Sequence, residues 1–188
     1  YGVSATPFRG DGLEKINFML LGPIRYKFTA KDRAKEQGIE HLVYPRFTRA
    51  VAPKLQQEHM HPNEAYELIR DNDERDRQIA EDDRKSIEEG RTPVILTKYN
   101  DHSLKLFGLL KDSADKVFLL TGHDSKKEHK EVLEKMDHVS SDETMLLIAT
   151  GKLIGEGFDF PRLDTLIMAT PVSGRNVVEQ YAGRLNRD

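Results

Sequence analysis

The chain has 188 residues, and its 29 lysines and arginines against 32 aspartates and glutamates give a formal net charge of −3. This balance provides no global basic field for nucleic acid, although an acidic protein can still carry a local basic groove. The absence of cysteine excludes disulfides and cysteine-based zinc sites and fits a reducing, cytoplasmic location. No apolar run approaches the ~20 residues of a membrane span, and no signal peptide is visible, so no membrane partner is expected.

Both ends of the chain are predicted to be cut. Tyr1 opens directly on a strand-like run, and the chain stops one residue after Arg187, inside a segment with helical spacing. A helix would normally be capped before the chain ends. We therefore expect a piece of a longer protein, amounting to about one domain and part of another.

The first ninety residues predict short elements separated by turns. Apolar positions at helical spacing and a terminal glycine favour a helix over residues 13–22, and alternating apolar and basic residues favour a half-exposed strand over 23–28. We interpret the charge run within 62–90 as a solvated helix face of mixed sign rather than a binding surface. The other expected elements are a strand over 1–6, a short helix over 31–38, and an edge strand or extended linker over 40–51.

From residue 92 the pattern changes to alternating units. Continuous apolar runs alternate with amphipathic helical stretches, which indicates an α/β fold with a parallel sheet covered on both faces. Ligands of such sheets bind at the carboxyl ends of the strands, so the informative loops are those after Thr97, Thr121, Ala149 and Ala169. The expected strands are 93–97, 116–121, 144–149 and 163–169, and the expected helices are 102–111, 125–136 and a last one from 176 onward.

The loop after the third strand reads Ala149-Thr-Gly-Lys-Leu-Ile-Gly-Glu-Gly-Phe-Asp-Phe-Pro161. Its glycines allow the backbone to approach a ligand closely, and Thr150 with the N–H of Gly151 suits a phosphate at a helix start. Asp159, fixed by Pro161, could accept hydrogen bonds from a ribose hydroxyl. The alternative is a tight connection that needs its glycines for steric reasons alone.

The closing segment, Gln180-Tyr-Ala-Gly-Arg-Leu-Asn-Arg-Asp188, places Arg184 and Arg187 three residues apart. Residues at this spacing share a helix face, so both guanidiniums can point at one anion, and their planar donors fit phosphate oxygens. The arrangement is typical of arginine fingers, which complete a phosphoryl-transfer site built mostly elsewhere. A basic helix end that satisfies the helix dipole is the open alternative.

These features occur in an order that resembles superfamily 2 helicases and translocases. The glycine-rich loop and the closing segment resemble motifs V and VI. Ser4-Ala-Thr6 resembles motif III, Thr97-Lys-Tyr99 occupies the place of motif IV, and Leu120-Thr-Gly122 resembles the motif between IV and V. The runs Gly-Glu-Gly-Phe-Asp-Phe-Pro and Ala-Thr-Pro-Val-Ser resemble the branch of type III restriction subunits and XPB-like repair helicases.

The resemblance implies a RecA-like α/β fold in three parts. Residues 1–22 would end a first motor domain, 23–91 would provide linking strands and a charged helical segment, and 92–188 would form the second motor domain. ATP and Mg²⁺ are implied as cofactors of the full-length protein. The implied partners are DNA or RNA, with DNA favoured, and the missing first RecA-like domain.

The resemblance also assigns roles to residues. Arg187 would be the finger on the γ-phosphate, Arg184 a second phosphate or interdomain contact, and Gln180 a bridge toward the nucleotide. The implied nucleotide-binding residues are Gly155, Gly157 and Asp159, the nucleic-acid contacts are Thr150, Gly122 and Lys98, and the residues that couple the two sites are Ser4 and Thr6.

The chain lacks the parts that ATP hydrolysis needs from a first motor domain. It contains no Gly-x-x-x-x-Gly-Lys-Ser/Thr loop and no Asp-Glu-x-His box. We therefore expect the fragment alone to bind no cofactor and to hydrolyse no ATP. Two alternatives stay open, a nucleotide-dependent transferase of doubly wound fold and a degenerate helicase half that serves as a binding module.

Two further groups have simpler interpretations. His59 and His61 could bind zinc, but a site needs a third ligand in fixed geometry, so a solvated loop is favoured and no metal site is predicted. Tyr66 and Tyr99 could stack on bases, although half-buried packing tyrosines are favoured.

Overall fold

The structure is a computed structural model that describes residues 13–27, 32, 36, 38, 42–48, 62–150, 160–172, 178, 181 and 185. The chain divides into two units, the first formed by residues 1–46 with 172–183 and the second by 47–171 with 184–188. The strand expected over 1–6, most of the helix expected over 31–38 and most of the last helix lie outside the described residues.

The first unit contains helix α1, Glu14–Leu21. The helix ends at Gly22, which has a φ of +80° and donates its N–H to the Phe18 carbonyl at 2.9 Å. Glycine adopts this left-handed geometry without a steric penalty, so the predicted helix and its stop are confirmed. The strand predicted over 23–28 is wrong for residues 23–27, which form no strand. An alternating pattern forms a strand only where a neighbouring strand pairs with its backbone.

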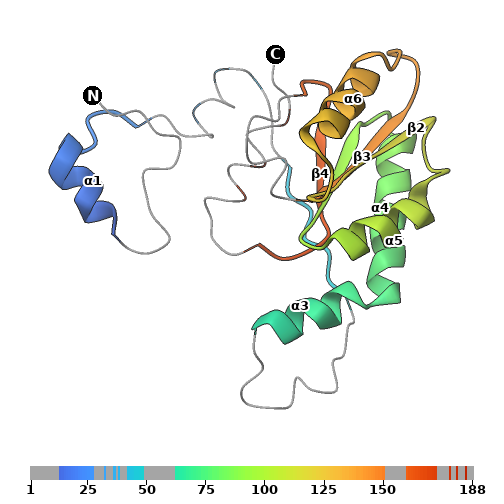
Figure 1. Ribbon diagram of the computed structural model, residues 1–188, viewed down its shortest axis with the longest axis horizontal. Helices are drawn as coiled ribbons and strands as arrows, with labels where there is room; N and C mark the ends of the chain where they lie inside the picture. The colour runs from blue at the N-terminus through green and yellow to red at the C-terminus, as the bar shows by residue number, and fades with distance from the viewer. Residues whose placement is uncertain are drawn as a thin grey trace. The chain divides into compact units, whose positions relative to one another are not determined.

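The second unit is built on a parallel sheet of four strands in the order β2-β3-β1-β4 (Figure 1). Strands β1 and β3 are buried along their whole length, as expected for continuous apolar runs between helices. The predicted α/β fold and its four strands are thereby confirmed. The strand bounds are Pro93–Thr97 for β1, Lys116–Leu120 for β2, Met145–Thr150 for β3 and Thr165–Met168 for β4.

Four helices are described in this unit, and two of them begin at strong caps. The Asn72 side chain accepts the Arg75 N–H at 2.9 Å at the start of α4, and Ser125 and Glu128 form a reciprocal capping box at the start of α6. The helix bounds are Pro62–Arg70 for α3, Asp73–Glu88 for α4, Asn100–Leu110 for α5 and Lys126–Asp137 for α6.

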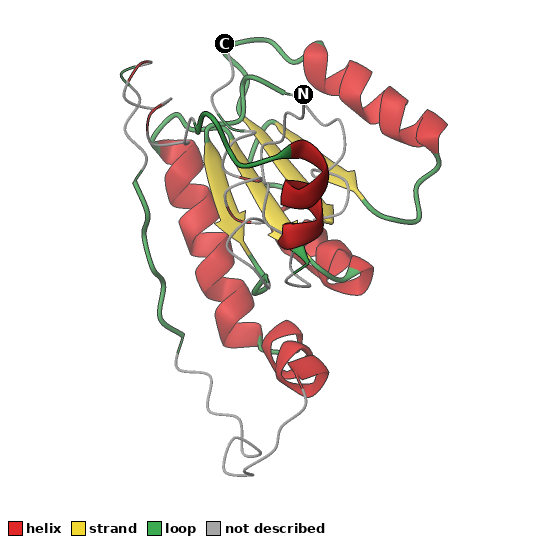
Figure 2. Cartoon of the chain, turned by 90° about the vertical axis from the view of Figure 1, so that its left-hand side faces the viewer, coloured by secondary structure: helices red, strands yellow, loops and turns green. Residues whose placement is uncertain are grey.

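Helices cover both faces of the sheet (Figure 2). Helices α4 and α5 pack on one face, where Val117 and Leu119 of β2 join the core, whereas α6 lies beside Phe118, which points to the other face. The core between the sheet and helices α4 and α5 consists of Ile79, Ala80, Ile87, Ile95, Leu106, Leu110, Leu146, Ile148 and Ala169.

The charged helix α4 is more than a solvated surface element. Its buried residues stand at positions 76, 79, 80, 83 and 87, a spacing that keeps them on one face of the helix. Two of them, Asp76 and Asp83, are acidic. The predicted mixed-sign solvated face therefore describes only the outer side of this helix, because a narrow apolar stripe is enough to dock the inner side on the sheet.

Candidate functional site

The carboxyl ends of β1, β2 and β3 lie along one side of the sheet, here called the carboxyl edge, because the strands run in parallel. Thr97 and Thr150, the last residues of β1 and β3, are direct neighbours in the register. Three residues predicted from the sequence as nucleic-acid contacts, Lys98, Gly122 and Thr150, lie at this carboxyl edge.

Gly122 lies close to two side chains, that of Asn100 at the start of α5 and that of Thr150 at the end of β3. Its N–H donates to Asn100 Oδ1 at 3.2 Å. A Cβ atom placed on Gly122 would lie 3.8 Å from Asn100 Oδ1 and 3.8 Å from Thr150 Oγ1, which is ordinary van der Waals contact. The fold itself therefore does not require glycine here, and a methyl group would fill a space that is now open between Asn100 and Thr150.

The Thr150 hydroxyl is buried and has no hydrogen-bond partner among the described residues. Buried polar groups in proteins almost always have a partner, so each exception needs a physical explanation. The hydroxyl is itself buried, but it lies at the carboxyl edge of the sheet beside the exposed Gly122, where a ligand bound at this edge would come near it. This atom is the strongest polar candidate that the edge presents.

Lys98 is exposed and lies between two aromatic rings. Its Nζ stands 4.3 Å from the centre of the Tyr66 ring and 5.5 Å from the centre of the Tyr99 ring. The Arg70 guanidinium lies 5.4 Å from the Tyr99 ring and also pairs with Asp71. The two rings thus contact cations of their own chain, which supports packing over base stacking as their role. Within the described part of the chain, Lys98 pairs with no carboxylate.

A chain of buried polar groups lies directly beneath this edge. Asp76 Oδ1 of α4 is 2.9 Å from His102 Nε2 of α5, and His102 Nδ1 is 2.8 Å from Thr97 Oγ1. The N–H of Tyr99 donates to the same Thr97 oxygen at 3.4 Å. On the other side, Lys105 Nζ lies 2.6 Å from Asp76 Oδ2. Helix α4 is thereby joined to the loop that carries Lys98.

Asp76 is ionised at neutral pH. Burial acts to raise the pKa of its carboxyl, but hydrogen bonds from His102 and Lys105 outweigh burial and leave the pKa below the ordinary value. The order Thr97–His102–Asp76 matches that of nucleophile–base–acid triads. However, the three residues are only 1 to 2% exposed, so no substrate can reach the hydroxyl and the arrangement is structural.

Arg75 connects α4 with the end of β4. Its guanidinium is half-buried and donates to the carbonyls of Ala169 and of Met168, the latter at 3.5 Å. Burial lowers the pKa of this guanidinium. The contact holds the start of α4 against the carboxyl end of β4.

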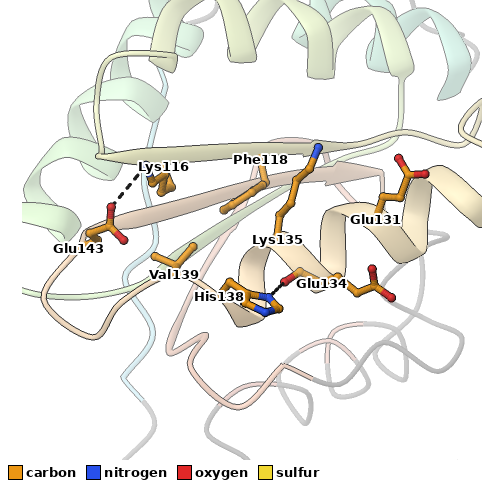
Figure 3. Close-up of a pocket in the computed structure, with 8 residues that line it drawn as sticks. All are labelled: Lys116, Phe118, Glu131, Glu134, Lys135, His138, Val139 and Glu143. Atoms are coloured by element: carbon orange, nitrogen blue, oxygen red, sulfur yellow. Dashed lines mark hydrogen bonds and ion pairs between the residues drawn. The ribbon is translucent and has the colours of Figure 1, made fainter.

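An open groove on the sheet lies away from this edge (Figure 3). It is bounded by α6 and by the amino-terminal half of β2, with Phe118 at its floor and Lys135 beside it. Lys116 at the start of β2 pairs with Glu143 at 3.3 Å. Because Lys116 begins β2, the groove is at the opposite end of the strand from Gly122 and contributes nothing to the carboxyl edge.

Most residues assigned by the motifs fall outside the described part of the chain. Among the described residues, no cluster of three histidine, aspartate or glutamate side chains could hold a metal ion. No described helix is long and apolar enough to cross a membrane. The assigned residues whose structure is not described are Ser4, Thr6, Gly155, Gly157, Asp159, Gln180, Arg184 and Arg187, together with His59 and His61 of the excluded zinc site.

Sequence reasoning missed three residues of this edge, Asn100, His102 and Asp76. The signal for Asp76 was present, because it stands three residues before Ile79 on the apolar stripe of its helix. His102 gave no comparable signal, since its partners are 5 and 26 residues away along the chain.

Comparison with known proteins relates the chain to one domain family. Residues 71–188 match the family described as helicase conserved C-terminal domain. Over 101 residues, 53% of this chain, it is 29% identical to the transcript termination protein A18 of fowlpox virus (strain NVSL), and the match spans 21% of that protein. The crystal structure of T4 UvsW superposes with a TM-score of 0.57 at 17% identity, covering 70% of this chain and 26% of that one. The chain thus spans about a quarter or less of either protein.

Proposed function

The chain belongs to the helicase conserved C-terminal domain family, and from this premise we propose that it is the second motor domain of an ATP-dependent helicase or translocase. The fold supports this reading, since the α/β sheet resembles that of T4 UvsW. The closer relation to type III restriction subunits and XPB-like helicases remains a prediction from the motifs, as does the division at residues 22 and 91.

One observation carries the nucleic-acid part of the proposal. Lys98 and Gly122 follow β1 and β2, Thr150 ends β3, and all three lie at the carboxyl edge of the sheet, where the buried Thr150 hydroxyl has no partner among the described residues. Within the described part of the chain the Lys98 ammonium has no carboxylate partner and the Thr150 hydroxyl has no hydrogen-bond partner. Together with the exposed backbone of Gly122, these groups suit a phosphodiester backbone. We propose that this edge binds nucleic acid through its backbone, without reading sequence.

ATP turnover requires a second domain under this proposal. Arg184, Arg187 and Gln180 would face the nucleotide phosphates, and Gly155, Gly157 and Asp159 its ribose. Ser4 and Thr6 would couple that site to the nucleic acid. The Mg²⁺ ion and the phosphate-binding loop would come from the first motor domain, because their motifs are absent from this sequence. The 188-residue chain alone is expected to hydrolyse no ATP.

Substitution of Thr150 tests the proposed edge. Thr150→Val removes the hydroxyl at nearly constant shape, whereas Thr150→Ser keeps it. We expect Thr150→Val to fold with undiminished stability and to bind a labelled single-stranded oligonucleotide about 5-fold more weakly, while Thr150→Ser binds as the parent does. Equal binding by the valine and serine variants would contradict the proposal.

The oligonucleotide should be tested both as DNA and as RNA. The sequence motifs favoured DNA, but the name of the viral relative refers to transcript termination. Binding of either should weaken as salt rises, because phosphate contacts release condensed counterions.

A further inference from the structure

The buried pair of Asp76 and His102 lies too deep to touch a ligand, yet its hydrogen-bond chain reaches the loop of residues 98 and 99 that joins β1 to α5. Both residues are 1% exposed. We propose that they are positioning residues for nucleic-acid binding. Through the Thr97 hydroxyl they hold this loop in the conformation that presents Lys98 to a phosphate. This inference rests on the proposed nucleic-acid role of the carboxyl edge.

The direction of two of these hydrogen bonds follows from the chemistry of the groups. The Asp76 carboxylate can only accept, so His102 Nε2 carries a proton and donates to it. The other ring nitrogen, Nδ1, shares a hydrogen bond with the Thr97 hydroxyl. The Thr97 oxygen accepts the N–H of Tyr99. Each donor has one acceptor, so the network defines the orientation of both Thr97 and the Tyr99 amide.

A contribution to stability alone does not account for this network. Taking a carboxylate and an imidazole out of water is costly, and apolar side chains of similar volume often replace such buried polar groups without loss of stability. What an apolar core cannot do is hold a hydroxyl and a backbone amide in one orientation. The network therefore has a geometric role, and the segment that it orients is the one after Thr97.

The conformation of this loop also sets the position of Asn100 and, through it, of the contact to Gly122. The loop leads into Asn100, the first residue of α5, whose carbonyl accepts from Ser103 Oγ at 2.7 Å and whose Oδ1 accepts the Gly122 N–H. A shift of the Tyr99 amide would therefore displace both Lys98 before it and Asn100 after it. Loss of the Thr97 hydroxyl should weaken the contact to Gly122 as well as the placement of the ammonium.

A matched set of threonine variants tests the inference in the 188-residue chain. Thr97→Val removes the hydroxyl that joins His102 to Tyr99, and Thr97→Ser retains it. Thr92→Val is the control, because Thr92 is also buried but precedes the opposite end of β1. Hydrogen exchange of the Tyr99 amide and affinity for a fluorescein-labelled single-stranded oligonucleotide of about 20 nucleotides are measured for each.

We expect Thr97→Val to accelerate Tyr99 exchange about 10-fold and to weaken oligonucleotide binding about 5- to 10-fold. Thr97→Ser and Thr92→Val should match the parent chain in both measurements. If all three variants lose affinity to the same extent, or if Thr97→Val exchanges faster but binds normally, the positioning role is wrong.

A second variant covers the possibility that Thr97→Val does not fold. Asp76→Asn keeps the side-chain shape and removes the charge that anchors His102, and it should produce the same two changes at smaller size. Normal exchange and normal affinity in a folded Asp76→Asn would overturn the inference. A parent chain that binds no oligonucleotide would instead refute the proposed function, while Tyr99 exchange would still report whether the network holds the loop.

Discussion

Gly122 and Asn100 connect the loop after β2 to the first residue of α5 through a single hydrogen bond of 3.2 Å. Among the described residues, a Cβ atom on Gly122 would meet Asn100 Oδ1 and Thr150 Oγ1, both at 3.8 Å. The surface at Gly122 is therefore open because this residue has no side chain, although a Cβ atom would fit there. Under the proposed function, glycine at this position lets a nucleic-acid backbone approach closely.

The first prediction follows from that space. Gly122→Ala should change the free energy of unfolding by less than about 0.5 kcal/mol, because the methyl group meets no clash. It should weaken oligonucleotide binding about 10-fold, since the methyl group fills the space that a nucleic-acid backbone would enter. Fluorescence anisotropy and urea unfolding measure the two quantities. Unchanged affinity in a folded variant would show that nothing binds there.

The second prediction concerns the way α3 supports Lys98. Tyr66 lies in α3, before the segment that matches the helicase family, and its ring is 4.3 Å from Lys98 Nζ. Tyr66→Leu removes the ring and should weaken oligonucleotide binding a few-fold, because a cation–π contact contributes about 0.5–1 kcal/mol. Tyr66→Phe keeps the ring and should bind normally. If both variants bind equally well, α3 has no part in placing Lys98.

The third prediction isolates the charge of Lys98. Lys98→Gln should reduce the slope of log affinity against log salt concentration by about 1, the expected loss for one phosphate contact. Lys135→Gln on α6 is the control, because Lys135 lies beside the groove at the other end of β2. Titrations at several salt concentrations give both slopes. An unchanged slope for Lys98→Gln would remove Lys98 from the interface.

The fourth prediction is a pH dependence of stability caused by Asp83. This carboxyl is fully buried, accepts one hydrogen bond from Ser113 at 3.0 Å, and burial raises its pKa to about 6. Because the folded-state pKa lies above the unfolded value of 3.8, the protonated form favours folding. The stabilisation from protonated Asp83 is complete when the pH is below the unfolded-state pKa of 3.8, and it is lost as the pH rises through about 6.

Asp83→Asn should therefore raise the free energy of unfolding at about pH 7 by roughly 1–3 kcal/mol and flatten its pH dependence between about pH 4 and pH 6. Glu81→Gln is the matched control, since Glu81 stands on the exposed side of the same helix. Urea unfolding across this range gives both curves. A variant that keeps the slope of the parent would show that another group is responsible.

The strands could be predicted because each contains a continuous apolar run, a pattern typical of strands between two layers of helices. Strands β1 and β3 are buried along their whole length, whereas β2 and β4 are mostly half-buried. The positions of Lys98, Gly122 and Thr150 at one edge followed from the parallel arrangement. The strand expected over 23–28 failed in its described part because alternation cannot supply a pairing partner.

The buried polar groups could not be predicted in the same way. Asp76 stands in a run of charged residues, and its burial depends on His102, which is 26 residues away and on another helix. Its place three residues before Ile79 puts Asp76 on the apolar stripe, unlike the exposed Asp73, but the local sequence does not show that a carboxylate there has a buried partner. Only the docking of α4 against α5 decides which carboxylate enters the core.

The most direct test of the central claim is the ATPase rate of the full-length protein, in which the proposal joins this chain to a first motor domain. Arg187→Ala should lower the nucleic-acid-stimulated rate about 10³-fold or more, because a missing arginine finger leaves the transition-state charge unstabilised. Arg84→Ala, which removes an exposed arginine of α4, should leave the rate unchanged. An intact ATPase rate in Arg187→Ala would contradict the motor-domain account and would indicate a binding module instead.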